Sequence, residues 1–240
     1  MAVGRGTGTH ILQFCKTLSL KETSTMKMNI CKLARYTIII AVLIAIVIIT
    51  YNKYRPYAKP IMYPEIGYST PNFDSTAVNE LHGVILHHTA EPSVEKALNI
   101  LSSPENKVGA HVVIDTDGTR YIMADPYAVT YHAGLSILNN RESCNYFTIG
   151  IEFQGNTLVA PLTKDQIASG VEYLLPIIEK YNISLENIVT HEMVRTAYKQ
   201  KYPTQYCSGK VDITQTEYIK FMRALREEIN HVVDSNKRAL

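Results

Sequence analysis

The sequence is poor in cysteine and in net charge. Its 240 residues contain four cysteines, which are too few for a disulfide scaffold. The formal net charge is only +2, and no long basic run follows the amino-terminal region, which argues against a nucleic-acid partner. The sequence also has no internal repeat and no His-Glu-x-x-His motif, so a zinc endopeptidase of that class is not indicated. The chain is long enough for one sizeable core with appendages.

One long apolar run stands near the amino terminus. Between Tyr36 and Tyr51 the sequence has neither a charge nor a glycine, and with Leu33 and Ala34 the run reaches the roughly 17 to 25 residues that a bilayer span needs. We therefore predict a single transmembrane helix over residues 33–51, with a tyrosine suited to each interface. A cleaved secretory signal peptide is the alternative, but no small-x-small cleavage site follows the run.

The charges that flank this run predict its orientation. More basic residues precede it than follow it, which places the amino terminus in the cytoplasm and the carboxyl-terminal part outside the membrane. Either Met26 or Met28 could be the true start, because the residues before them show no periodicity. The predicted divisions are a disordered cytoplasmic tail (1–32), the anchor (33–51), a stalk rich in Tyr and Pro (52–72), a folded domain (73–232) and a short tail (233–240).

Apolar periodicity predicts alternating strands and helices in the domain. The Asp117-Gly118 pair indicates a hairpin, and Thr163 with Gln166 forms a capping box that begins a helix. Because strands and helices are interleaved, we predict an α/β domain with a central mixed β-sheet flanked by helices. The expected strands are 84–86, 110–114, 120–123, 148–153 and 188–190, and the expected helices are 93–101, 163–178 and a last one that begins at a second capping box, Thr214 with Glu217.

Two histidines follow short apolar runs roughly a hundred residues apart. We expect His87 and His191 at strand ends, where a rigid backbone holds the imidazole in place as a metal ligand or catalytic base. A catalytic zinc needs three protein ligands of nitrogen, oxygen or sulfur type and an open fourth position. Two histidines alone would equally fit hydrogen-bonded core positions. The choice between a metal site and core packing therefore depends on the remaining motifs.

Six short motifs follow one another along the domain. They are Val84-Ile-Leu-His-His-Thr-Ala90, Gly109-Ala-His-Val-Val-Ile-Asp-Thr-Asp-Gly118, Tyr131-His-Ala-Gly134, Asn145-Tyr-Phe-Thr-Ile-Gly-Ile-Glu152, Val189-Thr-His191 and Lys210-Val-Asp212. In this order they resemble the zinc-dependent N-acetylmuramoyl-L-alanine amidases, a group that includes the peptidoglycan recognition proteins. The resemblance runs from about Gly83 to Leu225. It implies the amidase-like fold for the domain.

The resemblance implies a Zn²⁺ ion bound by His87, His191 and a third ligand. Family members use either a carboxylate in a Lys-x-Asp sequence or a cysteine in a Cys-Pro-Gly sequence, and this chain approaches both. We expect the third ligand to be Asp212, which stands just before the last helix. Cys207 departs from the family pattern because Ser208 follows it, and an exposed thiol is prone to oxidation. It could instead pair with Cys144 or stay free.

The resemblance also implies roles around the metal. Glu152 matches the catalytic glutamate, which takes a proton from the zinc-activated water and passes it to the leaving amine. Lys210 matches the cation that stabilises the oxyanion. His132 and Tyr131 match the substrate groove, with Tyr131 standing where the family usually has Trp. His111, on the hairpin, is expected to be a packed histidine rather than a ligand.

The implied function is hydrolysis of the amide that joins N-acetylmuramic acid to L-alanine in peptidoglycan, by an enzyme tethered outside the cytoplasmic membrane. Intact peptidoglycan or released muropeptides would be the partner. The alternative is a non-catalytic peptidoglycan recognition protein that keeps the groove without the chemistry. The complete set of Glu152 and three candidate ligands favours the enzyme, because a pure binder has no need of all four.

Overall fold

The protein is described by a computed structural model in which residues 36–46, 63–205 and 212–239 are placed. The chain divides into two units, Met1–Lys59 and Pro60–Leu240, each considered by itself. In the first unit, residues 36–46 form a helix with exposed side chains. The rest of the predicted span at 33–51, and the predicted tail at 1–32, lie outside the described residues. Among the described helices, none is both long and apolar enough to cross a membrane.

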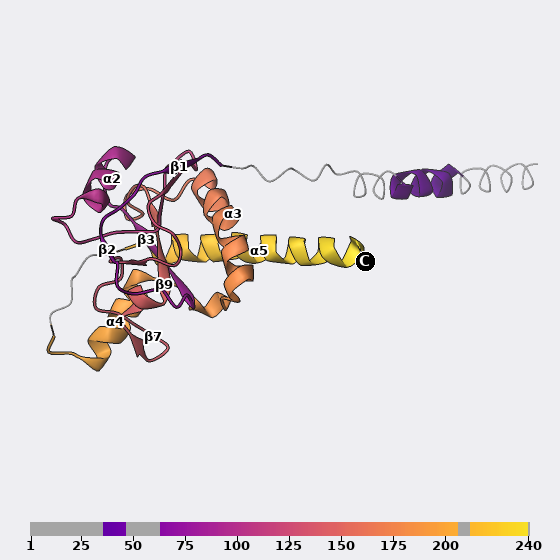
Figure 1. Cartoon of the computed structure of the whole chain (residues 1–240). Helices are drawn as coiled ribbons and strands as arrows, with labels where there is room; N and C mark the ends of the chain where they lie inside the picture. The colour runs from indigo at the N-terminus through magenta and orange to yellow at the C-terminus, as the bar shows by residue number, and fades with distance from the viewer. Residues whose placement is uncertain (1–35, 47–62, 206–211, 240) are drawn as a thin grey trace, which may run out of the picture. The chain divides into compact units, whose positions relative to one another are not determined.

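A six-stranded mixed sheet forms the centre of the second unit (Figure 1). Its strands are β1 (Glu65–Gly67), β5 (Arg120–Ile122), β4 (Val112–Ile114), β9 (Thr148–Phe153), β3 (Gly83–His88) and β10 (Ile188–Thr190), in that spatial order. The last four run parallel, whereas β5 is antiparallel to β4 and β1 is parallel to β5. The carboxyl ends of β9, β3 and β10 therefore meet at one edge of the sheet. The central β3 and β9 are buried along their whole length, as expected for strands covered on both faces.

Helices and short strand pairs complete the unit. The helices are α2 (Val94–Ser102), α3 (Lys164–Tyr181), α4 (His191–Lys201) and α5 (Gln215–Ala239), with 3-10 turns at Cys144–Tyr146 and Leu185–Asn187. The two-stranded pairs are β2 (Phe73–Asp74) with β6 (Val129–Thr130) and β7 (Ile137–Leu138) with β8 (Arg141–Glu142).

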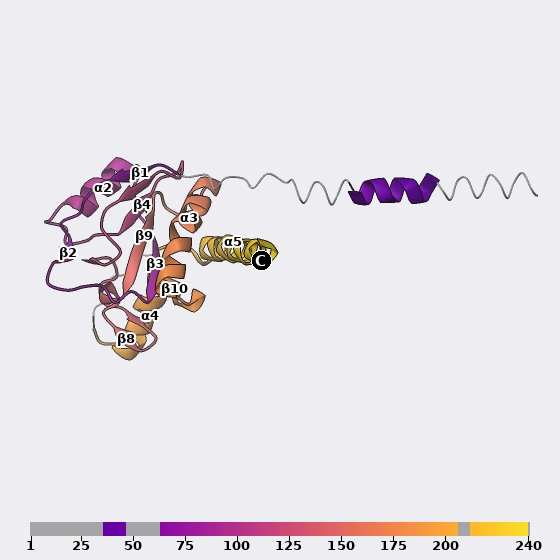
Figure 2. The same ribbon diagram turned by 45° about the vertical axis from the view of Figure 1, so that its right-hand side comes forward.

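The main hydrophobic core lies between the sheet and the pair α3 and α5, which cover the same face in both views (Figures 1 and 2). Side chains alternate along a strand, so Ile149, Ile151 and Phe153 of β9 all point into this core. The Phe153 ring meets Phe221 of α5 edge-on, with ring centroids 5.6 Å apart. Each fully buried side chain of this size contributes about 1.5–3 kcal/mol, which fixes α5 against the sheet.

Helices α2 and α4 pack against the opposite face. Val194 of α4 packs with Ile85 of β3, and Leu98 of α2 packs with Val113 of β4. By strand alternation His87 points to this same face, two residues beyond Ile85. The polar ends of β3 and β9 thus lie on the face that α2 and α4 cover.

The local sequence signals for α2, α3 and the hairpin are confirmed. Ser93 caps α2 by accepting a hydrogen bond from the Lys96 N–H, and Thr163 with Gln166 forms the reciprocal capping box of α3. Gly118 adopts φ +85° in the turn between β4 and β5, a conformation that glycine allows at little cost. The predicted mixed sheet flanked by helices is likewise present.

Two boundaries and one helix cap differ from those predicted. Residues Glu65–Gly67, assigned to the stalk, form the edge strand β1 through pairing with β5, a contact between distant segments that local sequence does not reveal. Helix α5 continues through residues 233–239, assigned to a tail. Glu217 does not form the predicted capping box at the start of α5. Its Oε2 accepts a hydrogen bond from the Leu162 N–H, and Oε1 accepts one from Lys220.

Candidate metal centre

The sheet brings two of the predicted site residues side by side. β3 and β9 are parallel neighbours, and His87 is directly paired with Glu152 in their register. Both side chains therefore leave the sheet on the same face. His191 is the first residue of α4 and follows β10, the neighbour of β3 on its other side. The Thr190 hydroxyl caps α4 by accepting from the Met193 N–H, which fixes the turn that aims His191.

Asp212 completes a cluster with these two imidazoles. Its Oδ2 lies 3.2 Å from Nδ1 of His87 and 2.8 Å from Nδ1 of His191. The ligand atoms of the three residues all lie within 4.8 Å of one another. Asp212 is 1% exposed and His87 2% exposed, so the cluster is largely removed from solvent.

The Asp212 carboxylate is held so that one oxygen faces the imidazoles. The other, Oδ1, accepts hydrogen bonds from the backbone N–H of His88 at 2.8 Å and of Ile213 at 3.3 Å. Burial raises the pKa of this carboxyl, but the adjacent His87 and the close contacts of Oδ2 with both imidazoles outweigh that effect and hold the pKa well below its usual range. The group is therefore a carboxylate at neutral pH.

This donor set fits a zinc ion. Two imidazole nitrogens, from β3 and from the start of α4, converge with one carboxylate oxygen from the segment before α5. They match the three-ligand pattern of catalytic zinc. The outer nitrogen of His191 is also engaged, because its Nε2 donates to the Ala133 carbonyl at 3.1 Å. Metal-binding histidines typically donate their second N–H in this way.

A cavity of about 330 Å³ opens beside the cluster, a size suited to a small-molecule or peptide ligand. His87, His191 and Glu152 line it together with the predicted groove residues Tyr131 and His132. Glu152 is 7% exposed and is therefore buried beside the cavity, whereas Tyr131 is 38% exposed and reaches solvent. The structure thus places a carboxyl group and an aromatic face around one concave site.

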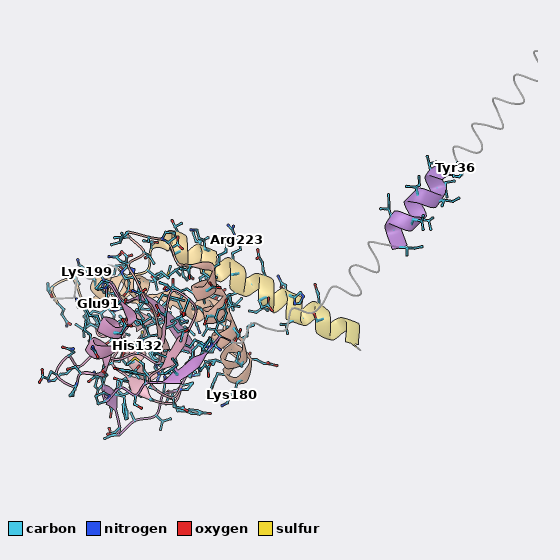
Figure 3. The ribbon with its side chains drawn as sticks, turned by 90° about the horizontal axis from the view of Figure 1, so that it is seen from above. Tyr36, Glu91, His132, Lys180, Lys199 and Arg223 are labelled. Atoms are coloured by element: carbon cyan, nitrogen blue, oxygen red, sulfur yellow. The ribbon has the colours of Figure 1, made fainter. Side chains whose placement is uncertain are left out.

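His132 contacts the cluster directly, which the sequence did not predict. Its Nδ1 lies 3.3 Å from Nε2 of His87, and the two rings meet edge-on. Burial lowers the pKa of His132 well below its ordinary value, and the neighbouring His87 and His111 lower it further. His132 lies within the body of the domain, whereas Lys180 lies at its edge (Figure 3).

Gly150 makes room for His132. A Cβ at position 150 would lie 2.5 Å from Cγ of the His132 ring, so only glycine fits at this point of β9. A glycine inside a buried strand is the sequence signal that could have revealed this close approach. His111 is packed, as expected. Its Nε2 donates to the Ala128 carbonyl, and its Nδ1 accepts from the Gly150 N–H, each at 3.0 Å.

Two predicted site residues fall in the undescribed segment 206–211. These are Lys210, expected at the oxyanion, and Cys207, the alternative third ligand. Asp212 is therefore the only one of the two candidate third ligands with a described position. Cys144 is a buried free thiol, and burial raises its pKa to about 11.

Comparison with known proteins gives one family. The family model described as N-acetylmuramoyl-L-alanine amidase (Amidase_2) matches residues 77–210, more than half of the chain. The matched segment includes His87, Glu152 and His191 and ends just before Asp212.

Curated relatives match shorter segments. The 1,6-anhydro-N-acetylmuramyl-L-alanine amidase AmpD of Haemophilus influenzae is 38% identical over 88 residues, which cover 35% of this chain and 46% of that protein. The AmpD of Escherichia coli K12 is 43% identical over 56 residues, 22% of this chain and 30% of that protein. This chain thus spans less than half the length of either relative.

Solved structures resemble the fold. The catalytic domain of XlyA has a TM-score of 0.50 at 20% identity, with 67% of this chain and 98% of that chain covered. A mutant of PlyL has the same TM-score at 12% identity, with 69% and 99% covered. At these identities the likeness concerns the fold alone.

Proposed function

The chain belongs to the N-acetylmuramoyl-L-alanine amidase family, and from this membership we propose that it hydrolyses the amide between N-acetylmuramic acid and L-alanine in peptidoglycan. The observation that carries the proposal is the convergence of His87, His191 and Asp212 beside Glu152 in one cavity. A carboxyl group next to a three-ligand metal site is the arrangement that metal-assisted hydrolysis requires.

We propose that His87, His191 and Asp212 hold a zinc ion. Bound there, zinc would supply Lewis acidity, polarising the substrate carbonyl and lowering the pKa of water in the site. The buried Asp212 carboxylate supplies the negative charge that compensates a dication, and its backbone hydrogen bonds keep Oδ2 toward the imidazoles. These residues would be preset for the ion before it binds.

Glu152 would move the proton. Hydrolysis adds the oxygen of water to the lactyl carbonyl carbon and breaks the bond to the L-alanine nitrogen, which must gain a proton to leave as an amine. The Glu152 carboxylate takes one proton from the attacking water and delivers it to that nitrogen. Its position opposite His87 in the β3–β9 register puts it beside the metal ligands. Lys210 would stabilise the oxyanion that forms on the carbonyl.

The cavity would hold the bond to be cut. The exposed ring of Tyr131 offers an aromatic face to a sugar or peptide, and it stands at the wall of the same cavity as Glu152. The AmpD relatives are named for a 1,6-anhydro-muramyl substrate. Released anhydro-muropeptides are therefore tested beside intact peptidoglycan.

The experiment compares the full chain with its Glu152→Ala variant. We expect zinc in both proteins, and release of stem peptide from the sugar, detected by mass spectrometry, from the wild type alone. Binding of muropeptide by wild type without cleavage, despite bound zinc, would refute the enzyme and support a recognition protein instead. Near wild-type hydrolysis by Glu152→Ala would show that another group transfers the proton.

We also propose that residues 33–51 anchor the protein in the cytoplasmic membrane, with the domain on the outer side. The uncharged run between Tyr36 and Tyr51 supports this, together with the basic residues before it. Membrane fractionation tests it with a double variant, Ile40→Lys with Ile44→Lys, because two charges near the centre of a span oppose insertion. Equal membrane association of both proteins, or none of either, would contradict the anchor.

A further inference from the structure

The outer nitrogen of His132 must carry a proton. Its Nε2 lies 3.3 Å from both the carbonyl oxygen and the hydroxyl oxygen of Thr148. A carbonyl can only accept a hydrogen bond. The Thr148 hydroxyl proton is already donated to the Cys144 carbonyl at 2.7 Å, so that oxygen can only accept as well. Both neighbours of Nε2 therefore require a donor.

The inner nitrogen of His132 is then an acceptor. A neutral imidazole with its proton on Nε2 has an unprotonated Nδ1. A second proton would create an imidazolium, which is costly in a site that is buried and lies against two other imidazole rings. The unprotonated Nδ1 faces Nε2 of His87 at 3.3 Å, so the proton between the two rings belongs to His87. With Nε2 occupied in this way, His87 can offer only Nδ1 to a metal.

Ala133, the residue after His132, fixes the tautomer of the other proposed histidine ligand, His191. The Ala133 carbonyl accepts from Nε2 of His191 at 3.1 Å, which leaves Nδ1 of His191 to face Asp212. The Asn145 side chain holds both acceptors, the His132 ring and the Ala133 carbonyl, through their backbone. The Asn145 amide oxygen accepts from the backbone N–H of His132 at 3.1 Å and from that of Ala133 at 2.7 Å.

We propose that His132 is a positioning residue that accepts the Nε2 proton of His87 and thereby selects Nδ1 as the ligand atom. With Ala133 and Asn145 it forms a clamp that sets the tautomers of both histidine ligands. This inference rests on the proposed metal site but not on the substrate. It gives the Tyr131-His-Ala-Gly segment a task beyond lining the groove. The metal ligands and the groove are then linked through two consecutive residues.

Two substitutions separate this role from simple packing. His132→Leu fills the space beside Gly150 but removes the acceptor. His132→Asn keeps one, because its amide oxygen can occupy the place of Nδ1. His111→Asn is the matched control, since His111 is also buried and touches the His132 ring, while its own hydrogen bonds go to Ala128, Thr130 and Gly150. Zinc affinity of the full chain is measured by competition with a chromophoric chelator, and thermal unfolding of each metal-free protein reports its fold.

We expect His132→Leu to weaken zinc binding by about 10- to 100-fold, with His132→Asn and His111→Asn closer to wild type. In metal-free wild type, long-range proton–nitrogen NMR should show a proton on Nε2 of His87. Equal losses in the Leu and Asn variants, no loss in either, or an unprotonated Nε2 on His87 would overturn the proposal. Zinc binding that follows this pattern in a protein without amidase activity would refute the proposed function and leave the clamp intact.

Discussion

The backbone of Gly150 lies so close to the His132 ring that a side chain at position 150 would overlap the imidazole. We expect Gly150→Ala to lower the free energy of unfolding by about 1–3 kcal/mol, the usual cost of overpacking a core. Gly67→Ala is the matched control, since a Cβ at position 67 meets nothing within 4 Å. Urea unfolding of the metal-free proteins gives both values. Equal stability of the two variants would show that His132 can move aside freely.

Replacement of Glu152 by glutamine should stop proton transfer without removing the metal. We expect Glu152→Gln to lower the hydrolysis rate by about 10²- to 10⁴-fold, the usual contribution of a general acid–base group. Zinc content, measured by atomic emission, should stay at the wild-type level. Glu142→Gln is the control, because Glu142 is exposed and bonds to Lys201 and Tyr202 at the surface. A comparable rate loss in that variant would point to a global effect.

The third ligand can be identified by two substitutions. Asp212→Ala removes the oxygen that faces both imidazoles, and we expect it to abolish stoichiometric zinc binding and hydrolysis together. Cys207→Ala should retain both. The measurement is zinc per protein after dialysis against a buffer with trace zinc. The reverse result, with zinc lost only from Cys207→Ala, would make Cys207 the ligand.

Stability should fall in mild acid because of His111. Burial lowers the pKa of this imidazole from 6.5 to about 4. Between pH 6.5 and pH 4 the imidazole is therefore protonated in the unfolded chain but neutral in the folded protein. The free energy of unfolding therefore decreases as the pH falls through this range, by about 3 kcal/mol from this group. Urea unfolding with a chelator present, at pH 7.5, 5.5 and 4, should give a steeper decline for wild type than for His111→Asn. Parallel declines would assign the acid sensitivity to other groups.

The Cys144 thiol should resist modification. Burial raises its pKa to about 11, and the thiolate is the reactive form. In a variant with the other three cysteines changed to serine, a disulfide exchange reagent at pH 8 should react with Cys144 only slowly. The same protein in denaturant should react fully within minutes. Fast reaction under native conditions would mean that this part of the fold opens readily.

Local sequence was sufficient for the elements with short-range signals. The Thr163–Gln166 capping box and the Asp117-Gly118 turn act between residues at most three positions apart, and both are present. β1 was not predictable, because Glu65 pairs with Arg120 across more than fifty residues. The second capping box fails for a similar reason, since Leu162 from another segment takes the Glu217 carboxylate.

In the site, too, local sequence patterns predicted some features, whereas contacts between distant residues could not be predicted. Periodicity placed His87 and His191 at strand ends, and parallel pairing then accounts for their proximity. The contact between His132 and His87 joins residues 45 positions apart through side chains alone. No spacing rule covers such a contact. Gly150, in the middle of a buried strand between two isoleucines, was its one trace in the sequence.

The place of Asp212 in the chain sets the order in which the protein can become functional. During synthesis the two imidazoles and Glu152 leave the ribosome first, and the carboxylate follows with α5, whose Phe221 and Leu225 are fully buried against the sheet. A nascent or truncated chain that ends before Asp212 has an unfinished core and only two of the three residues proposed to hold the metal. The proposed metal site is therefore complete only in a chain that extends to the segment leading into α5.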